Sequence, residues 1–283
     1  AGGGHRRLLT GQFFHARLRS LAPHARVVFF SGDVLEPEVV ALVDGVVQKP
    51  VGGRELVEAL GATLSDLRED AGARCLVVRS AGSHFCAGAD LKERRGMTLA
   101  DVREFVPRLG AVCRAVAALP FPTIAAVRGT AAGGGCELAL ACDLRVLADD
   151  ARIGLRETAL AIVPGAGGTC RLPRIAGLAV AKRWIFTAQM FTAEDARRDG
   201  VADAVVPGDR LDGHALELAR TIAANGPVAV RLAKKAIDGG FDLAIDDALA
   251  LEWSCYEGVL GTSDREEALA AFAEKRPPRF SGR

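Results

Sequence analysis

The chain has 283 residues, of which 49% are hydrophobic and 25% are charged, and its formal net charge at pH 7 is +1. This composition is typical of a globular protein with a hydrophobic core and argues against wholesale disorder. No apolar run reaches the roughly 20 residues that a membrane-spanning helix needs, so we expect no membrane insertion.

The first 32 residues have the composition of a mitochondrial transit peptide. They contain five arginines and no acidic residue, and their leucines approximate one face of a helix. We therefore predict a leader over residues 1–32 and a location in the mitochondrial matrix; a basic tail without a targeting role is the alternative. The rest of the chain carries 31 basic and 35 acidic residues, a balance that would not attract nucleic acid.

Cysteine usage points to free thiols. The seven cysteines are scattered and form no C-x-x-C pair. This pattern favours reduced cysteines in an intracellular compartment over a disulfide framework or a zinc site, so we predict no metal site.

Residues 33–91 predict, in chain order, a hairpin, a helix, a strand and a loop. Two runs, 38–43 and 46–47, flank Asp44-Gly45 and predict a β-hairpin. Apolar positions recur at helical spacing between residues 56 and 67, which predicts an amphipathic helix ending near Gly72. Residues 75–80 are predicted as a buried strand, followed by a loop of small residues over 81–91.

Further strand, loop and helix units follow. Thr98 and Asp101 match a helix-capping signal, and Pro107 should kink or interrupt the helix that they start. Strands are predicted at 123–127, 144–148 and 201–206, and short helices at 179–187 and 193–199, the second capped by Thr192. This repetition predicts an α/β core over residues 33–210 with parallel strands. Residues 211–283 are predicted to form a helical region that is suited to packing against other subunits.

Two small-residue loops are candidates for an oxyanion site. Residues 87–90 and the glycines at 133–135 each follow a predicted strand, and a helix pattern begins directly after the glycines. Free N–H groups in the first turn of a helix attract negative charge, and glycines allow a ligand oxygen to approach. If the loops converge, each would supply one N–H to a thioester or amide oxygen. Two unrelated tight turns are the alternative.

Glu137 and Glu157 are the candidate acid and base. Each lies beside a glycine turn in an otherwise apolar stretch, whereas a lone glutamate is more often a solvated surface residue. Two carboxylates in one dry pocket push their pKa values apart, so that one holds a proton near neutrality. The sequence lacks a G-x-S-x-G elbow and a phosphate-binding G-K-S/T loop, and the glycines at 165–168 complete no dinucleotide fingerprint.

Three ordered motifs resemble the enoyl-CoA hydratase/isomerase (crotonase) family. They are FCAGADLKER, GGGCELALACDLRV and GLRETALAIVPGAGGTCRLPR, and the similarity runs from about residue 54 to the C-terminus. The resemblance implies a core of repeated ββα spiral turns, a C-terminal helical oligomerisation region and assembly as a homotrimer or homohexamer. It implies an enoyl-CoA hydratase that adds water across a short or branched 2-enoyl-CoA, with 3-methylglutaconyl-CoA as one candidate.

The resemblance also assigns roles to individual residues. The oxyanion N–H groups fall on Ala89 and Gly134, and the two catalytic carboxylates on Glu137 and Glu157. No metal or separate cofactor is implied, since coenzyme A is part of the substrate. The remaining substrate- and CoA-binding positions fall on Ala87, Asp90, Leu91, Lys92, Gly133, Gly165 and, from a neighbouring subunit, Lys275.

The sequence is also compatible with functions other than hydration. An enoyl-CoA isomerase would use the same frame, and a weakly catalytic thioester-binding homologue would fit the shortened turn at residues 48–53, where the family holds the adenine of CoA. RNA binding is not supported, because the first helix, 53–70, has no lysine. Arg156 is a candidate for binding a distal carboxylate of the acyl group, although neighbours in an extended segment usually point to opposite sides.

Overall fold

The computed structural model describes residues 25–31, 45–48, 53–80, 82–88 and 91–283. Most of the predicted leader, the first strand of the predicted hairpin and the shortened turn lie outside these ranges. In the described part of the chain, no helix is both long and apolar enough to cross a membrane.

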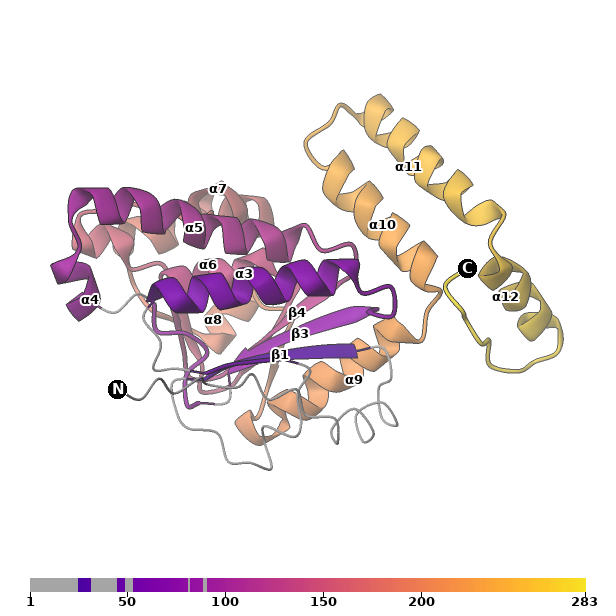
Figure 1. Cartoon of the computed structure of the whole chain (residues 1–283), viewed down its shortest axis with the longest axis horizontal. Helices are drawn as coiled ribbons and strands as arrows, with labels where there is room; N and C mark the ends of the chain where they lie inside the picture. Colours follow the sequence, from indigo (N-terminus) through magenta and orange to yellow (C-terminus); the bar gives the residue numbers. More distant parts are fainter. Residues whose placement is uncertain (1–24, 32–44, 49–52, 81, 89–90) are drawn as a thin grey trace, which may run out of the picture.

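A six-stranded sheet forms the centre of the molecule (Figure 1). Every neighbouring pair in it is parallel, as predicted. The central strands are buried on both faces, which explains why they read as continuous apolar runs. In spatial order the strands are β2 (Gly45–Gln48), β1 (Ala25–Ser31), β3 (Cys75–Ser80), β4 (Thr123–Val127), β6 (Leu144–Ala148) and β9 (Ala204–Val206).

The N-terminal edge of this sheet differs from the prediction. β1 lies within the segment assigned to the leader, and it pairs with β3 from Ala25↔Cys75 to Phe30↔Ser80. The sheet therefore begins before the boundary that we placed at residue 32. β2 is the second strand of the predicted hairpin, but its pairing with β1 is parallel.

A second, three-stranded sheet was not predicted. It consists of β5 (Thr130–Ala132), β7 (Arg152–Gly154) and β8 (Phe191–Thr192), with β7 in the middle. Strands of two or three residues are too short to show an alternating pattern, so only contacts with distant segments define them.

Helices cover both faces of the large sheet. Helices α3 (Gly53–Glu69), α5 (Leu99–Ala117) and α6 (Gly134–Ala141) lie on one side, and α9 (Leu211–Ala223) packs on the other (Figure 1). The predicted capping box is present, because Thr98 and Asp101 exchange hydrogen bonds at the start of α5. Pro107 does not interrupt α5, which continues through it as one helix, and the alternative outcome, a kink at Pro107, stays a prediction.

Smaller helices connect these layers. They are α4 (Leu91–Gly96), the 3₁₀ helix η1 (Glu157–Leu160), α7 (Gly168–Thr187), α8 (Ala193–Arg198) and the 3₁₀ helix η2 (Gly208–Arg210). Thr192 caps α8 as predicted, and α7 begins earlier than predicted and bends at Gly177.

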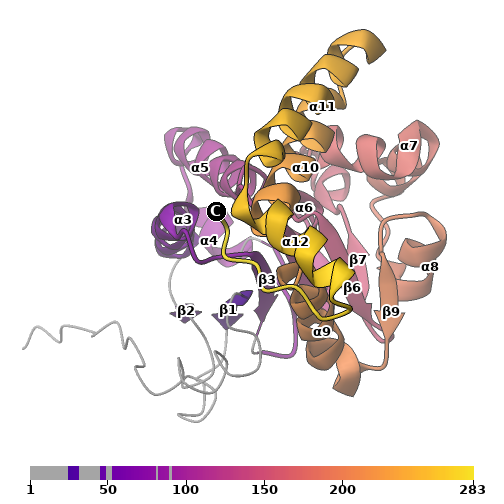
Figure 2. The ribbon, with the colours of Figure 1, turned by 90° about the vertical axis from the view of Figure 1, so that its right-hand side faces the viewer.

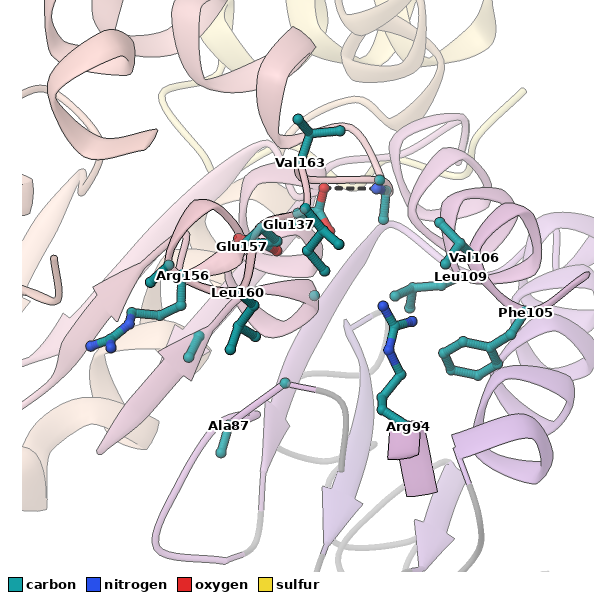
Figure 3. Close-up of a pocket in the computed structure, with 18 residues that line it drawn as sticks. Ala87, Arg94, Phe105, Val106, Leu109, Glu137, Arg156, Glu157, Leu160 and Val163 are labelled. Carbon is teal, nitrogen blue, oxygen red and sulfur yellow. Dashed lines mark hydrogen bonds between the residues drawn. The ribbon is translucent and has the colours of Figure 1, made fainter. Parts of the chain in front are cut away.

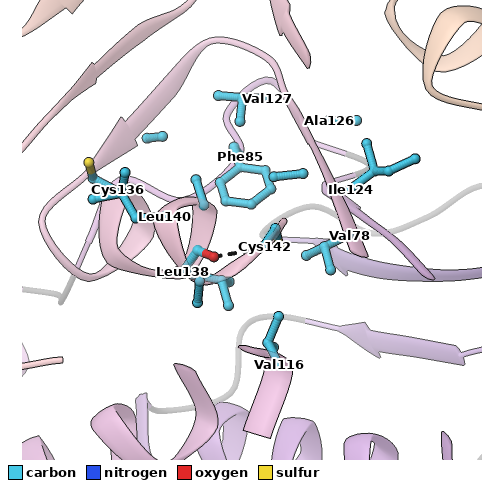
Figure 4. Close-up of a cluster of buried hydrophobic side chains, with 14 of the residues drawn as sticks. Val78, Phe85, Val116, Ile124, Ala126, Val127, Cys136, Leu138, Leu140 and Cys142 are labelled. Atoms are coloured by element: carbon cyan, nitrogen blue, oxygen red, sulfur yellow. Dashed lines mark hydrogen bonds between the residues drawn. The ribbon is translucent and has the colours of Figure 1, made fainter. Parts of the chain in front are cut away.

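The buried core lies between the large sheet and the α3, α5 and α6 layer. Phe85 and Ile124 face Leu138 and Leu140 of α6 in this cluster (Figure 4). α6 is buried over nearly all its length, so its N-terminus has a fixed position at the end of the sheet.

The C-terminal helices extend away from the core. Helices α10 (Pro227–Gly240) and α11 (Ile245–Leu260) form a hairpin beside the sheet layers, and α12 (Ser263–Ala273) lies next to them (Figure 2). Large apolar side chains on these helices and in the turn between α10 and α11 are exposed, among them Phe241, Ile245, Trp253 and Phe272.

Candidate active site

One cavity of about 370 Å³ gathers most of the residues that the motifs singled out (Figure 3). Its walls come from the loop before α4, from α4 and α5, from the turn before α6, and from the segment around η1. The described lining residues are Ala87, Gly88, Arg94, Phe105, Val106, Leu109, Ala132, Gly133, Gly134, Glu137, Arg156, Glu157, Ala159, Leu160, Ile162, Val163, Gly165 and Ala166.

The two small-residue loops converge, as the oxyanion hypothesis requires. The Cys86 N–H donates to the Thr130 carbonyl at 3.0 Å, and the Ala132 N–H donates to the Cys86 carbonyl at 2.9 Å. These bonds hold the first loop against β5. Gly135 is needed at this contact, because a Cβ there would overlap with the Cys86 carbonyl oxygen.

Gly134 is the first residue of α6 and supplies the candidate oxyanion N–H. N–H groups in the first helical turn have no intrahelical acceptor, so Gly134 can donate into the cavity. The preceding Gly133 has a left-handed φ of 53°, which turns the chain from β5 into α6. Ala89, the predicted second donor, and Asp90 lie outside the described residues.

Glu137 is held rigidly at the bottom of the site. It is 2% exposed, and its Oε1 accepts the N–H of Ala166 at 2.7 Å and the N–H of Gly168 at 2.9 Å. Burial raises the pKa of the Glu137 carboxyl above its ordinary value, and the two N–H groups act in the opposite direction by stabilising the carboxylate. The glycine turn at 165–168 therefore positions an acid–base group.

Glu157 begins η1 and faces the same cavity. Burial is the main cause of the raised pKa of its carboxyl, and the charge of Glu137 raises it further. Its Oε2 is buried and has no hydrogen-bond partner in the described part of the chain. This oxygen differs from Oε1 of Glu137 because it is not committed to a backbone donor.

The remaining predicted residues divide into three groups. Ala87, Gly133 and Gly165 line the cavity. Leu91 and Lys92 form the first turn of α4, but their side chains are outside the described part of the structure. Lys275 follows α12 and does not line this cavity, so its role toward a neighbouring subunit stays a prediction.

Sequence reasoning missed most of the cavity wall. Phe105, Val106 and Leu109 recur at helical spacing within α5, and such spacing does not distinguish a core face from a cavity face. Leu160 and Val163 are exposed apolar residues of the opposite wall. Arg94 was part of a motif without an assigned role.

His, Cys, Asp and Glu side chains are the groups that could ligate a metal ion. In the ranges that the structure describes, no three or more His, Cys, Asp or Glu side chains are grouped so that they could hold a metal ion. The described chemistry-bearing groups of the cavity are two carboxylates, two guanidinium groups and backbone N–H donors.

Comparison with known proteins shows the family to which the chain belongs. Residues 53–283 match the enoyl-CoA hydratase/isomerase family model, so the chain belongs to that family, the crotonases. It is therefore an enzyme of a family that acts on acyl-CoA thioesters, and its predicted crotonase fold is confirmed.

Particular relatives are similar over most of the chain. Rat "Methylglutaconyl-CoA hydratase, mitochondrial" is 47% identical over 81% of this chain and 74% of its own length. Mouse "Enoyl-CoA hydratase domain-containing protein 2, mitochondrial" is 48% identical over 82% of this chain and 80% of its own length. The crystal structure of an enoyl-CoA hydratase from Bacillus anthracis has 47% identity and a TM-score of 0.80, and the match covers 81% of this chain and 90% of that one.

Proposed function

We propose that the chain hydrates the 2,3 double bond of a short or branched 2-enoyl-CoA. The observation that carries this proposal is that Glu137 and Glu157, both buried, face one cavity beside the Gly134 N–H. A hydratase needs one group to activate water and another to donate a proton, and the two carboxylates supply both functions.

The thioester oxygen would accept the Gly134 N–H and, as the family resemblance implies, the N–H of Ala89. Charge moves onto this oxygen when water adds to the double bond. A preorganised N–H donor stabilises the resulting enolate-like state by roughly 2.7–4 kcal/mol.

The environments of the two carboxylates divide the roles. The N–H groups of Ala166 and Gly168 favour the charged form of Glu137, so we assign Glu137 as the base. Burial and the charge of Glu137 favour the protonated form of Glu157, so we assign Glu157 as the proton donor.

In the proposed reaction the atoms of one water balance the addition. Glu137 takes a proton from water while the oxygen forms a bond to C3, and the π electrons move toward the thioester oxygen. When the carbonyl reforms, C2 takes the proton of Glu157. Proton exchange returns Glu137 to its charged form and Glu157 to its protonated form. This scheme uses no metal and no redox cofactor.

Further parts of the proposal rest on the relatives and the exposed helices. We propose 3-methylglutaconyl-CoA as one substrate, since the rat relative is named for it, and a mitochondrial matrix location, since both named relatives are mitochondrial. The exposed apolar residues of α10, α11 and α12 support association with further subunits, and the family resemblance implies a homotrimer or homohexamer. In that assembly Lys275 would reach a neighbour's CoA. Light scattering tests the assembly.

Loss of absorbance from the conjugated thioester of crotonyl-CoA tests the hydration. We expect turnover by the wild-type chain, and a drop of roughly 100- to 10,000-fold in both Glu137→Gln and Glu157→Gln. The exposed Glu58→Gln is the matched control and should keep wild-type turnover. A chain that binds crotonyl-CoA but only shifts the double bond of a 3-enoyl-CoA would be an isomerase, and a folded chain with neither activity would contradict the proposal.

A further inference from the structure

Arg94 brings a positive charge to the wall of the cavity. It lies on α4, is half-buried and lines the cavity together with Phe105 and Leu109. In Figure 3 its side chain extends from α4 into the space between Leu160 and Phe105. An apolar wall gives a guanidinium no hydrogen-bond acceptors.

This guanidinium has no anionic partner in the described part of the chain. Among those residues, no carboxylate lies within ion-pair distance of Arg94, and neither Glu137 nor Glu157 pairs with it. A partly desolvated charge is costly unless it is paired, and the planar guanidinium matches a carboxylate in a two-pronged geometry. The arrangement therefore favours an anionic group on the ligand.

Arg156 does not fill this role, although the sequence singled it out. It is exposed at the edge of the cavity, and Figure 3 shows its guanidinium pointing away from Glu137 and Glu157. Its neighbour Glu157 is the first residue of η1 and faces the cavity, whereas Arg156 immediately precedes that helix.

We infer that Arg94 binds a carboxylate at the far end of the acyl group. The cavity would then favour 2-enoyl thioesters that carry a second, terminal carboxylate. This inference rests on the proposed function, because the catalytic glutamates and Gly134 fix the thioester end of the acyl group. It adds to that function a subsite for the other end.

A pair of substrates with equal carbon number isolates the carboxylate. Glutaconyl-CoA and 2-pentenoyl-CoA both have five acyl carbons, and the first ends in a carboxylate where the second ends in a methyl group. The measured quantity is the ratio of kcat/KM for glutaconyl-CoA to kcat/KM for 2-pentenoyl-CoA. For Arg94→Met we expect this ratio to fall roughly 10- to 100-fold, the worth of a hydrogen bond between charged groups.

Two further variants test whether the effect is specific to the guanidinium of Arg94. Arg94→Lys keeps the charge but loses the two-pronged geometry, so it should retain part of the ratio. Arg156→Met removes the other guanidinium of the cavity edge and should leave the ratio unchanged. An equal loss on both substrates in Arg94→Met would overturn the inference, because it would place Arg94 against a CoA phosphate or in a structural role.

Binding of saturated thioesters separates this inference from the proposed function. Glutaryl-CoA and pentanoyl-CoA cannot be hydrated, so calorimetric titration reports recognition without turnover. We expect the wild-type chain to prefer glutaryl-CoA and Arg94→Met to lose that preference, whether or not hydration is seen. Equal affinities in the wild-type chain would overturn the inference and leave hydration of crotonyl-CoA untouched.

Discussion

The backbone N–H of Ala166 donates a 2.7 Å hydrogen bond to Oε1 of Glu137, although the two residues are 29 positions apart in the chain. The turn that contains Ala166 therefore does more than reverse the chain, since it holds an acid–base carboxylate in one orientation. A carboxylate that is already fixed in one orientation needs little rearrangement during a reaction, so the free-energy cost of reorganisation is small.

This bond allows activity and stability to be separated at Glu137. Glu137→Gln keeps an oxygen that can accept the N–H groups of Ala166 and Gly168, whereas Glu137→Ala leaves both donors unpaired. We expect both variants to lose turnover. The unfolding free energy of Glu137→Ala should be about 1–3 kcal/mol lower than that of Glu137→Gln. Chemical denaturation measures this difference. Equal stabilities would mean that the two bonds do not hold the turn.

Glu157 makes stability depend on pH in a direction opposite to that of an ion-paired acid. Burial raises the folded-state pKa of its carboxyl above the ordinary value of 4.5. Well below pH 4.5 the proton is present in both the folded and the unfolded state. As the pH rises further, the unfolded chain loses its proton first, so the free energy of unfolding falls until the raised pKa is passed.

Glu157→Gln removes this titration. We therefore expect its stability relative to the wild-type chain to increase over the pH range above about 4.5, until the raised pKa is passed, by about 1.4 kcal/mol for each unit by which the pKa is raised. Urea denaturation across this range gives the comparison, with Glu58→Gln on the surface as the control. Parallel curves for wild type and Glu157→Gln would contradict the prediction.

Gly133 has a left-handed φ of 53°, and a Cβ at this position would lie 3.1 Å from Oε1 of Glu157. Gly133→Ala should therefore lower the unfolding free energy by about 1–2 kcal/mol and reduce turnover by displacing Glu157. Gly61→Ala in α3 is the matched control, because its Cβ meets no atom within 4 Å. That variant should raise stability by about 0.5–1 kcal/mol. Thermal unfolding and crotonyl-CoA turnover test both changes.

The proposed oxyanion donor can be deleted without removing the helix. Gly134 is the first residue of α6, a position where proline is tolerated, and Gly134→Pro removes its N–H. Gly134→Ala adds a Cβ near Leu109 but keeps the N–H. We expect kcat to be roughly 100- to 1000-fold lower in Gly134→Pro than in Gly134→Ala. Similar kcat values in two folded variants would show that this N–H does not bind the thioester oxygen.

Elements with local signals could be predicted from the amino-acid sequence alone. Apolar runs marked β3, β4 and β6, and Thr98 and Thr192 marked helix starts by hydrogen bonds that span three positions. The glycines at 133–135 indicated the turn before α6, and three ordered motifs identified the family. These signals are readable because each depends on residues close together in the chain.

Contacts between residues far apart in the chain became known only from the tertiary structure. It placed β1 in the sheet, where the composition of the segment had indicated a leader, because strand pairing depends on a partner 50 positions away. It assembled β5, β7 and β8, which are too short to show a period. It also turned Arg94 into the cavity and left the guanidinium of Arg156 at the cavity edge, pointing away from the two glutamates, since the packing of α4 and of the segment around η1 sets side-chain direction and residue type does not.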